Sequence, residues 1–385
     1  MPLPIYLDHA ATTPVRPEVV EAMAPFFGPR FGNPSSAHRW GREARTALDE
    51  ARERIARTLG ARVDEIVFTS CGTEADNLAL LGAWRAIRSE RPAIVTSPIE
   101  HKAVLAAAHR IAGEGGEERL VDVNEHGVVD RASYDAKVDA RTGVVSIMWV
   151  NNEIGVVQPI AELGAKSKEQ GAVFHTDAVQ AFGKIPIDVS KLPVDLLTIS
   201  GHKIGAPKGI AALFVRRGVR IEPMMHGGDQ DRGRRPGTEN VAFAVGLARA
   251  AELAVEEREA ECTRLAALRE QLESALLARI PDAIVHGRGA TRAPHILNIS
   301  VAGTDSESLL MALDLQGVAC SAVSACQTGN VSPSHVLKAM GVRPDIATSA
   351  IRMSLGSLTT PDNVTRVAEL FPALIQKARR LAGQT

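Results

Sequence analysis

The chain reads Val173-Phe174-His175-Thr176-Asp177-Ala178-Val179-Gln180 and, after a short interval, Leu196-Leu197-Thr198-Ile199-Ser200-Gly201-His202-Lys203. In both stretches a short apolar run typical of a buried strand leads into polar residues. Similar runs occupy 66–69, 93–96, 144–150 and 211–215, and helical patterns separate them. This alternation predicts an α/β fold in which a mostly parallel sheet is covered by helices on both faces.

The chain beyond residue 239 follows a different pattern. Residues 239–280 contain no proline and are rich in Ala, Leu, Glu and Arg, so they predict a long helix, broken once, that links two domains. Strand-like runs then lie at 283–286, 296–301 and 351–355, with helical patterns at 306–316, 332–340 and 361–381. We expect a large α/β domain, 15–250, and a smaller α+β domain formed by 1–14 and 251–385.

Composition favours small-molecule chemistry. The 385 residues carry 44 Lys and Arg against 45 Asp and Glu, so the net charge of −1 gives no electrostatic footprint for nucleic acid or an anionic membrane. The N-terminus lacks a basic segment followed by an apolar core, and no apolar run approaches the roughly 18 residues of a spanning helix. We expect a cytoplasmic protein with neither nucleic-acid nor membrane partners.

Asp177 and Lys203 follow two of the apolar runs, and open α/β sheets usually bind ligands at the carboxyl ends of their strands. A lysine can hold pyridoxal phosphate (PLP) as a Schiff base. A carboxylate facing the pyridine nitrogen keeps that nitrogen protonated, which makes the ring an electron sink. The pair therefore suggests a PLP enzyme, although these two residues alone leave open an Asp at a strand end and a surface Lys in a loop.

A phosphate site is indicated at 68–77, where a strand-like run passes through a turn containing Gly72 and Thr73 into a helix. Free N–H groups at a helix start attract anions. Ser200 and His202 flank Lys203 and could contact the same phosphate. Taken alone the segment is weak evidence, because most strand–turn–helix junctions bind nothing.

Other polar residues could complete such a site. His101 follows the second strand-like run and could stack on the pyridine or move protons. Asn152 and Gln180 could bond the cofactor's phenolic oxygen, and Arg352 could clamp a substrate carboxylate. The alternatives are a histidine at a helix start, amides in turns and an arginine in a structural ion pair.

Cys326 differs from the other cysteines. It lies in a polar stretch of small residues, 321–330, whereas unreactive cysteines are typically buried. Cys71, Cys262 and Cys320 are interpreted as structural, and four cysteines without a CxxC pair form no disulfide framework. Cys326 is therefore the candidate reactive thiol, although the residues alone leave its role open.

Taken together, these motifs resemble those of the cysteine desulfurases, in the class V aminotransferase group of fold-type I PLP enzymes. The resemblance runs nearly end to end. It is carried by Tyr6-Leu7-Asp8-His9-Ala10-Ala11-Thr12-Thr13-Pro14, Gly32-Asn33-Pro34-Ser35-Ser36, Thr73-Glu74-Ala75-Asp76-Asn77, Glu100-His101-Lys102, Asn151-Asn152-Glu153-Ile154-Gly155, His175-Thr176-Asp177, Ser200-Gly201-His202-Lys203, Arg235-Pro236-Gly237-Thr238-Glu239-Asn240, Ser324-Ala325-Cys326 and Ile351-Arg352-Met353-Ser354.

The resemblance implies a PLP-dependent transferase of fold type I with a seven-stranded sheet. The cofactor-binding residues that it implies are Lys203, Asp177, Asn152, Gln180, Thr73, Gly72, Ser200, His202 and Thr238. Thr238 would reach the phosphate of the other subunit, which makes a homodimer the functional unit.

The resemblance also implies a reaction. L-cysteine, held by Arg352 and Asn33, would become L-alanine through the catalytic residues Lys203, His101 and Cys326. The sulfur would remain on Cys326 as a persulfide and pass to acceptors that include an iron–sulfur scaffold protein. No intrinsic metal is expected, and Cys326 is the residue that would meet a cluster on a partner.

Some positions depart from the family pattern. His9 stands where Asn is more familiar, Cys71 where the phosphate turn often has Gly, and Val323 where Gly would leave the loop more mobile. Selenocysteine lyase and class V aminotransferase remain alternative activities, and a catalytically idle PLP-fold binding subunit is the alternative from another class. An aminotransferase would not need Cys326.

Overall fold

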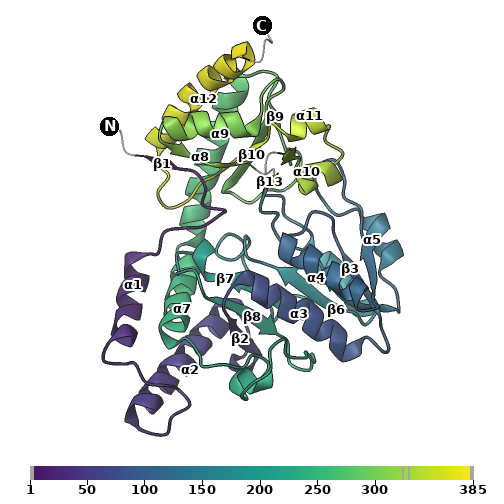
Figure 1. Ribbon diagram of the computed structural model, residues 1–385, viewed down its shortest axis with the longest axis vertical. Helices are drawn as coiled ribbons and strands as arrows, with labels where there is room; N and C mark the ends of the chain where they lie inside the picture. The colour runs from purple at the N-terminus through teal and green to yellow at the C-terminus, as the bar shows by residue number, and fades with distance from the viewer. Residues whose placement is uncertain (1–3, 323–324, 328–329, 382–385) are drawn as a thin grey trace.

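The computed structural model describes residues 4–322, 325–327 and 330–381 (Figure 1). Its central sheet has seven strands in the order β2-β8-β7-β6-β5-β3-β4. The five strands from β7 to β4 are parallel, and β8 runs antiparallel to both of its neighbours. The predicted mostly parallel sheet is confirmed. The strands are β2 (Ile66–Thr69), β3 (Ala93–Thr96), β4 (Glu117–Leu120), β5 (Thr142–Ser146), β6 (Val173–Asp177), β7 (Leu196–Ser200) and β8 (Ala211–Val215).

Helices bury both faces of this sheet. Alternate residues of a strand enter different cores: Leu197 packs with α1, α2 and α7, whereas Leu196 packs with α3 and α4. Because neither face meets water, the strands read as continuous apolar runs. The helices around this sheet are α1 (Pro17–Met23), α2 (Arg39–Leu59), α3 (Gly72–Ile87), α4 (Lys102–Gly113), α5 (Arg131–Lys137), α6 (Ile160–Glu169) and α7 (Val241–Glu256), with short 3₁₀ turns η1 (Ala24–Phe27), η2 (Val63–Glu65), η3 (Gly201–Lys203) and η4 (Gln230–Gly233).

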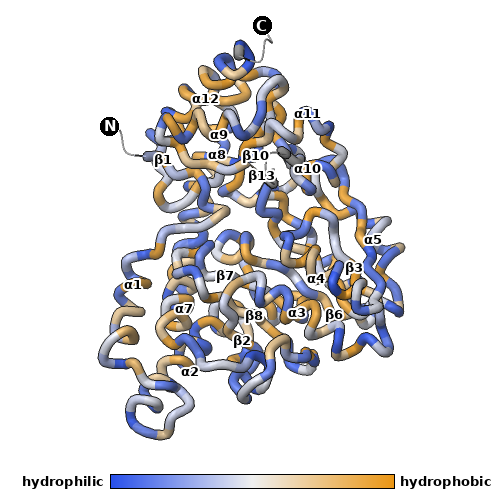
Figure 2. The backbone as a smooth tube through the Cα atoms, viewed as in Figure 1, coloured by the Kyte–Doolittle hydropathy of each residue, from blue (hydrophilic) through white to orange (hydrophobic). Residues whose placement is uncertain are grey.

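A second core forms around a four-stranded antiparallel sheet in the order β12-β15-β10-β9. The N-terminal strand β1 joins this region by pairing in parallel with β11. Helix α12 alternates hydrophobic and hydrophilic turns along its length (Figure 2), as expected of a helix with one buried face. The strand at the start of the chain and the elements of its C-terminal part are β1 (Ile5–Tyr6), α8 (Arg258–Arg279), β9 (Ile284–Val285), β10 (Ile296–Ser300), α9 (Ser306–Leu315), β11 (Val318–Ala319), β12 (Ser321–Ala322), β13 (Ala325–Gln327), β14 (Asn330–Ser332), α10 (His335–Ala339), α11 (Pro344–Ala347), β15 (Ile351–Ser354) and α12 (Pro361–Leu381).

The long helix expected at 239–280 is present and is broken once, because α7 ends at Glu256 and α8 begins at Arg258. Three other expectations differ in detail. Strand β5 ends at Ser146, so the run expected to continue to residue 150 is buried but not extended as a strand to its end. The edge strand β4 was not expected from its sequence Glu-Glu-Arg-Leu. Helix α10 begins only at His335, where the Ser334 side chain caps the helix.

The part of the chain that the structure describes contains no helix long and apolar enough to cross a membrane.

Candidate active site

A cavity of about 360 Å³ lies at the carboxyl ends of β6 and β7. The end of β6, the turn after β7 and the start of α3 all contribute to its walls, and the N-terminal segment and β15 close it. Ten of the residues predicted from the sequence line this one cavity: Gly72, Thr73, His101, Asn152, Asp177, Gln180, Ser200, His202, Lys203 and Arg352.

Lys203 ends the 3₁₀ turn that follows β7. Its ammonium donates to the carbonyl oxygens of Ala10 and Ala11, each at 2.7 Å. Burial lowers the pKa of Lys203 to about 8, and the nearby Arg352 charge adds to this effect. The amine is therefore far easier to deprotonate than an ordinary lysine, as a nucleophilic lysine requires.

Asp177 is the last residue of β6 and is only 5% exposed. One carboxylate oxygen accepts a hydrogen bond from the backbone N–H of Val179 at 2.9 Å. Burial raises the pKa of Asp177, whereas His101 and the Val179 N–H oppose the rise. A buried carboxylate of this kind is well suited to pair with a cationic ring nitrogen.

His101 caps the start of α4, because its Nδ1 accepts the backbone N–H of Ala103 at 3.2 Å. The helix-start position considered from the sequence is therefore correct, and the same side chain also lines the cavity. Nδ1 is an acceptor, so the neutral ring carries its hydrogen on Nε2. The enclosing protein lowers the pKa of His101, which favours this neutral form.

The turn before α3 fits a phosphate group. A Cβ at Gly72 would lie 3.3 Å from Val179 and 3.6 Å from the Ser200 side chain, so glycine keeps this part of the wall open. The Ser200 hydroxyl is buried and has no hydrogen-bond partner among the described residues. A buried hydroxyl normally has a partner. An uncommitted donor beside free helix N–H groups is what a phosphate needs, so the residues present fit PLP.

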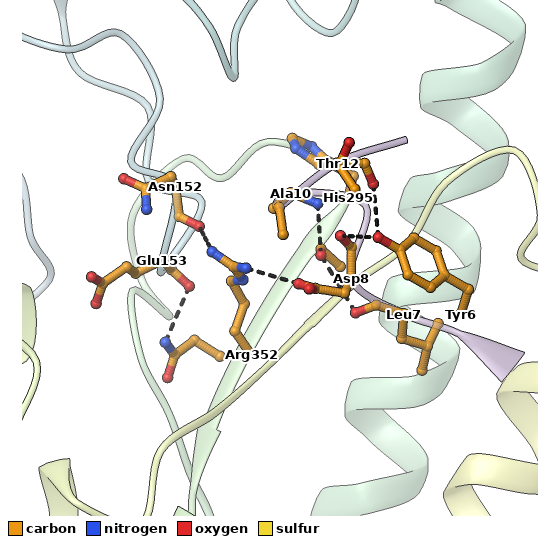
Figure 3. Close-up of polar contacts among 12 residues, drawn as sticks. Tyr6, Leu7, Asp8, Ala10, Thr12, Asn152, Glu153, His295 and Arg352 are labelled. Atoms are coloured by element: carbon orange, nitrogen blue, oxygen red, sulfur yellow. Dashed lines mark hydrogen bonds and ion pairs between the residues drawn. The ribbon is translucent and has the colours of Figure 1, made fainter. Parts of the chain in front are cut away.

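Arg352 lies on β15 and lines the cavity. Its guanidinium lies between Asn152 and Asp8 (Figure 3). One terminal nitrogen donates to the Asp8 carboxylate at 2.8 Å and the other to the backbone oxygen of Asn152 at 2.9 Å. Tyr6 fixes the same segment, because its hydroxyl lies 3.1 Å from the Asp8 carbonyl oxygen and 2.9 Å from that of Thr12. The ion pair considered from the sequence and a position in the cavity wall are thus both present.

Gln180 is more engaged than the sequence suggested. Its amide nitrogen donates to the Ala10 carbonyl at 2.9 Å, and its oxygen lies 3.2 Å from Nε2 of His295. His202 likewise contacts the N-terminal segment, since its Nδ1 lies 3.2 Å from the Thr12 hydroxyl.

Two predicted residues lie outside the cavity of their own chain. Asn33 is exposed in the loop before α2, where its side chain accepts the backbone N–H of Ser35. Thr238 is exposed in the segment before α7. The structure does not bring either residue to Lys203 within one chain.

The cysteines occupy different surroundings. The Cys326 backbone belongs to β13 and pairs with Val331 of β14, but its side chain lies outside the described residues, as does all of Val323. Burial raises the pKa of Cys320 to about 12, so this thiol is not reactive at neutral pH. Cys262 donates to a backbone oxygen at 3.3 Å, and Cys71 is exposed at the start of α3.

Sequence reasoning gave no functional role to a buried polar row that reaches the cavity at Asp76. Asp76 is 1% exposed and has a carboxylate oxygen 3.6 Å from Nε2 of His175. His175 bonds the Ser146 and Thr198 hydroxyls at 2.8 and 3.1 Å, and burial lowers its pKa to about 3, so the ring is neutral. The sequence does carry a signal for this row, because His175 directly follows the apolar Val173 and Phe174 within a buried strand. No group of His, Cys, Asp or Glu within the described residues could hold a metal ion.

Comparison with known proteins agrees with this geometry. The aminotransferase class-V family model matches residues 5–367. A cysteine desulfurase IscS from Dictyoglomus turgidum is 45% identical over 378 residues, which cover 98% of this chain and 96% of that protein. A solved NifS-like protein superposes with a TM-score of 0.92 at 37% identity, covering 97% of this chain and 100% of its own. A solved structure described as SspA in complex with cysteine gives 0.81 at 33% identity, with 91% and 98% covered. The chain therefore belongs to the class V aminotransferase family of PLP-dependent enzymes.

Proposed function

We propose that this protein is a cysteine desulfurase, which converts L-cysteine to L-alanine and transfers the sulfur to Cys326. The observation that carries the proposal is the convergence of Lys203, Asp177, His101 and Arg352 on one cavity. The desulfurase names of relatives that match nearly the whole chain support the same activity.

The cofactor would be held by residues that already face the cavity. PLP supplies an electron sink when it is bound. Asp177 would keep the pyridine nitrogen protonated, while Gly72, Thr73, Ser200 and His202 would hold the phosphate. Asn152 and Gln180 would contact the phenolic oxygen, and the His101 ring would stack on the pyridine. The buried Asp177 carboxylate and the uncommitted Ser200 hydroxyl support these assignments.

Substrate binding and proton movement would follow from the same walls. Arg352 would bind the carboxylate of L-cysteine, since Asp8 and the Asn152 carbonyl hold its guanidinium in a fixed plane. The Lys203 amine would accept the proton from the substrate Cα and later return a proton. A lysine pKa of about 8 suits this exchange near neutral pH.

The Cys326 thiolate would then form an S–S bond to the substrate sulfur while the substrate's Cβ–S bond breaks. The sulfur is oxidised to the persulfide level. The electron pair of the broken bond stays with the carbon, which takes up a proton and becomes the methyl group of L-alanine. The persulfide would pass to an acceptor such as an iron–sulfur scaffold protein.

The proposal includes a homodimer. Asn33 and Thr238 lie outside the cavity of their own chain, so a second copy is the element that could bring them to a cofactor and substrate. The proposal also keeps the division into a large domain, 15–250, and a small domain, 1–14 and 251–385. A cytoplasmic location is part of the proposal as well, and the unpaired Cys71, Cys262 and Cys320 thiols support a reducing compartment.

The test is production of alanine and sulfide from L-cysteine with a reductant. Cys326→Ala should lose both products equally, whereas Cys320→Ala is the matched control and should retain them because that half-buried thiol is protonated at neutral pH. Lys203→Ala should lose the yellow colour of the purified protein. Unchanged turnover in Cys326→Ala would remove the thiol from the reaction and favour the aminotransferase or lyase activity.

A further inference from the structure

A second cavity, of about 550 Å³, adjoins the first. Gln180 and Lys203 belong to the walls of both cavities. The remaining walls come from the N-terminal segment up to residue 18, residues 179–184 after β6, residues 204–205 after η3, the region where α7 meets α8, His295 before β10, and the loop after β15. Its volume is that of a small-molecule site, and none of the steps proposed above uses it.

Two buried imidazoles lie in the wall of this second cavity. His9 and His295 are 4% and 3% exposed, and both line the cavity. Neither nitrogen of His9 has a hydrogen-bond partner among the described residues, and Nδ1 of His295 has none either. Buried ring nitrogens normally have partners, so three uncommitted ones on two residues that line a single cavity point to a ligand.

Hydrogen bonds and pKa shifts decide which ring nitrogens of His9 and His295 can donate or accept a hydrogen bond. The Gln180 amide nitrogen donates to Ala10, so its oxygen is the acceptor and Nε2 of His295 carries the hydrogen. Nδ1 of His295 is therefore an acceptor. Burial lowers the pKa of His9 to about 4 and that of His295 well below its usual value, so both rings are neutral. His9 consequently offers one donor and one acceptor.

Four basic side chains and three carboxylates line this cavity: Arg16, Lys184, Lys203 and Arg264 against Glu18, Glu257 and Glu261. Arg16 pairs with Glu257 at 2.7 Å and with Glu18 at 3.2 Å, and Arg264 pairs with Glu261 at 2.7 Å. The Lys184 ammonium has no hydrogen bond or ion pair within the described part of the chain. Burial lowers the pKa of Lys184, and the charges of Cys262 and Glu261 oppose that fall. The basic groups therefore outnumber the carboxylates by one, which matches a monoanion and disfavours a dianion such as phosphate.

We propose that the second cavity is a binding site for a small monocarboxylate, held by the Lys184 ammonium and the N–H of His9. An α-amino acid is the form of such a ligand that also supplies a donor for Nδ1 of His295. His9 stands where Asn is more familiar in the family. Its ring packs closely on Gly356, because a Cβ at residue 356 would lie 2.2 Å from the ring. The site goes beyond the proposed function and does not depend on it.

The test is calorimetric titration of the holoenzyme with acetate, L-alanine and inorganic phosphate. An Arg352→Gln background removes the carboxylate site expected in the first cavity. Acetate should bind once per chain, and Lys184→Gln should weaken it about tenfold, the effect of losing one charge-assisted contact. Lys191→Gln is the matched control, because Lys191 is 81% exposed, pairs with Asp188 at the surface and should leave acetate binding unchanged.

His9→Asn should also weaken acetate, which keeps the proposal testable if Lys184→Gln does not fold. Tighter binding of L-alanine than of acetate would support an amino acid as the ligand, and equal binding would support a simple carboxylate. Phosphate that bound more tightly than acetate, in a Lys184-dependent way, would overturn the assignment. Loss of all acetate binding in Arg352→Gln would also overturn it. Alanine production from L-cysteine, measured without the Arg352 change, tests the proposed function separately.

Discussion

Removing the Asp8 carboxylate should cost far more stability than removing a surface carboxylate. Asp8 and Arg352 lie 2.8 Å apart, and their side chains are only 18% and 9% exposed. Asp8→Ala leaves the guanidinium buried beside the Asn152 carbonyl without a counter-charge. Breaking a buried pair on one side costs about 3–5 kcal/mol. Asp8→Asn keeps an acceptor and should cost about 1.5–3 kcal/mol, the range for a hydrogen bond to a charged group.

The control is Asp345→Ala. Asp345 pairs with Arg343 at 3.1 Å, but the two side chains are 63% and 74% exposed, so the loss should be below about 1 kcal/mol. Urea unfolding at two PLP concentrations gives the free energies and separates cofactor binding from intrinsic stability. The double variant Asp8→Ala with Arg352→Met should recover part of the loss. Equal losses for Asp8→Ala and Asp345→Ala would refute the reasoning.

Two further substitutions and one pH profile test other parts of the structure. Gly72→Ala places a methyl group close to the Val179 and Ser200 side chains and should weaken PLP binding. The unfolding midpoint of the cofactor-free protein should stay nearly unchanged. A lower midpoint in the cofactor-free variant would contradict a local effect. Gly356→Ala brings a Cβ within 2.2 Å of His9 and should cost about 1–3 kcal/mol by overpacking, measured by urea unfolding, and the cost should largely disappear when His9 is also changed to Ala. The rate at which cofactor-free protein regains its yellow colour on addition of PLP should rise with pH and reach half of its maximum near pH 8. Only the neutral Lys203 amine is nucleophilic, and burial lowers the pKa of Lys203 from 10.5 to about 8. A rate that still rises above pH 10 would contradict a lowered pKa.

Most of the central sheet could be predicted because strands that are buried on both faces consist of continuous apolar residues. Strands β2, β3 and β8 coincide with apolar runs in the sequence. Strand β4 could not be found in this way, because it lies at the edge of the sheet, where a strand can carry charged residues. Its sequence is Glu-Glu-Arg-Leu. The run at 144–150 was assigned too long a strand because periodicity marks burial and does not mark where strand pairing stops.

The candidate site divides in the same way. Asp177 and Lys203 could be placed because each follows a recognisable strand, and the parallel sheet brings both to one edge. The partners of Lys203 and Arg352 could not be found, since Ala10 and Ala11 lie 193 and 192 residues from Lys203, and Asp8 lies 344 residues from Arg352. No local pattern encodes a backbone carbonyl that accepts a hydrogen bond from so distant a side chain.

The carbonyls that hold Lys203 also belong to the segment that carries Asp8, and the Ala10 oxygen additionally accepts from Gln180. Whenever the Lys203 amine engages a cofactor, it must give up these two acceptors. PLP binding and the local order of the N-terminal segment are therefore thermodynamically linked, because the Lys203 amine that binds PLP no longer donates to the Ala10 and Ala11 carbonyl oxygens. Amide hydrogen exchange at residues 9–13 should consequently quicken when PLP is loaded, so this segment would report occupancy of the catalytic lysine without any assay of turnover.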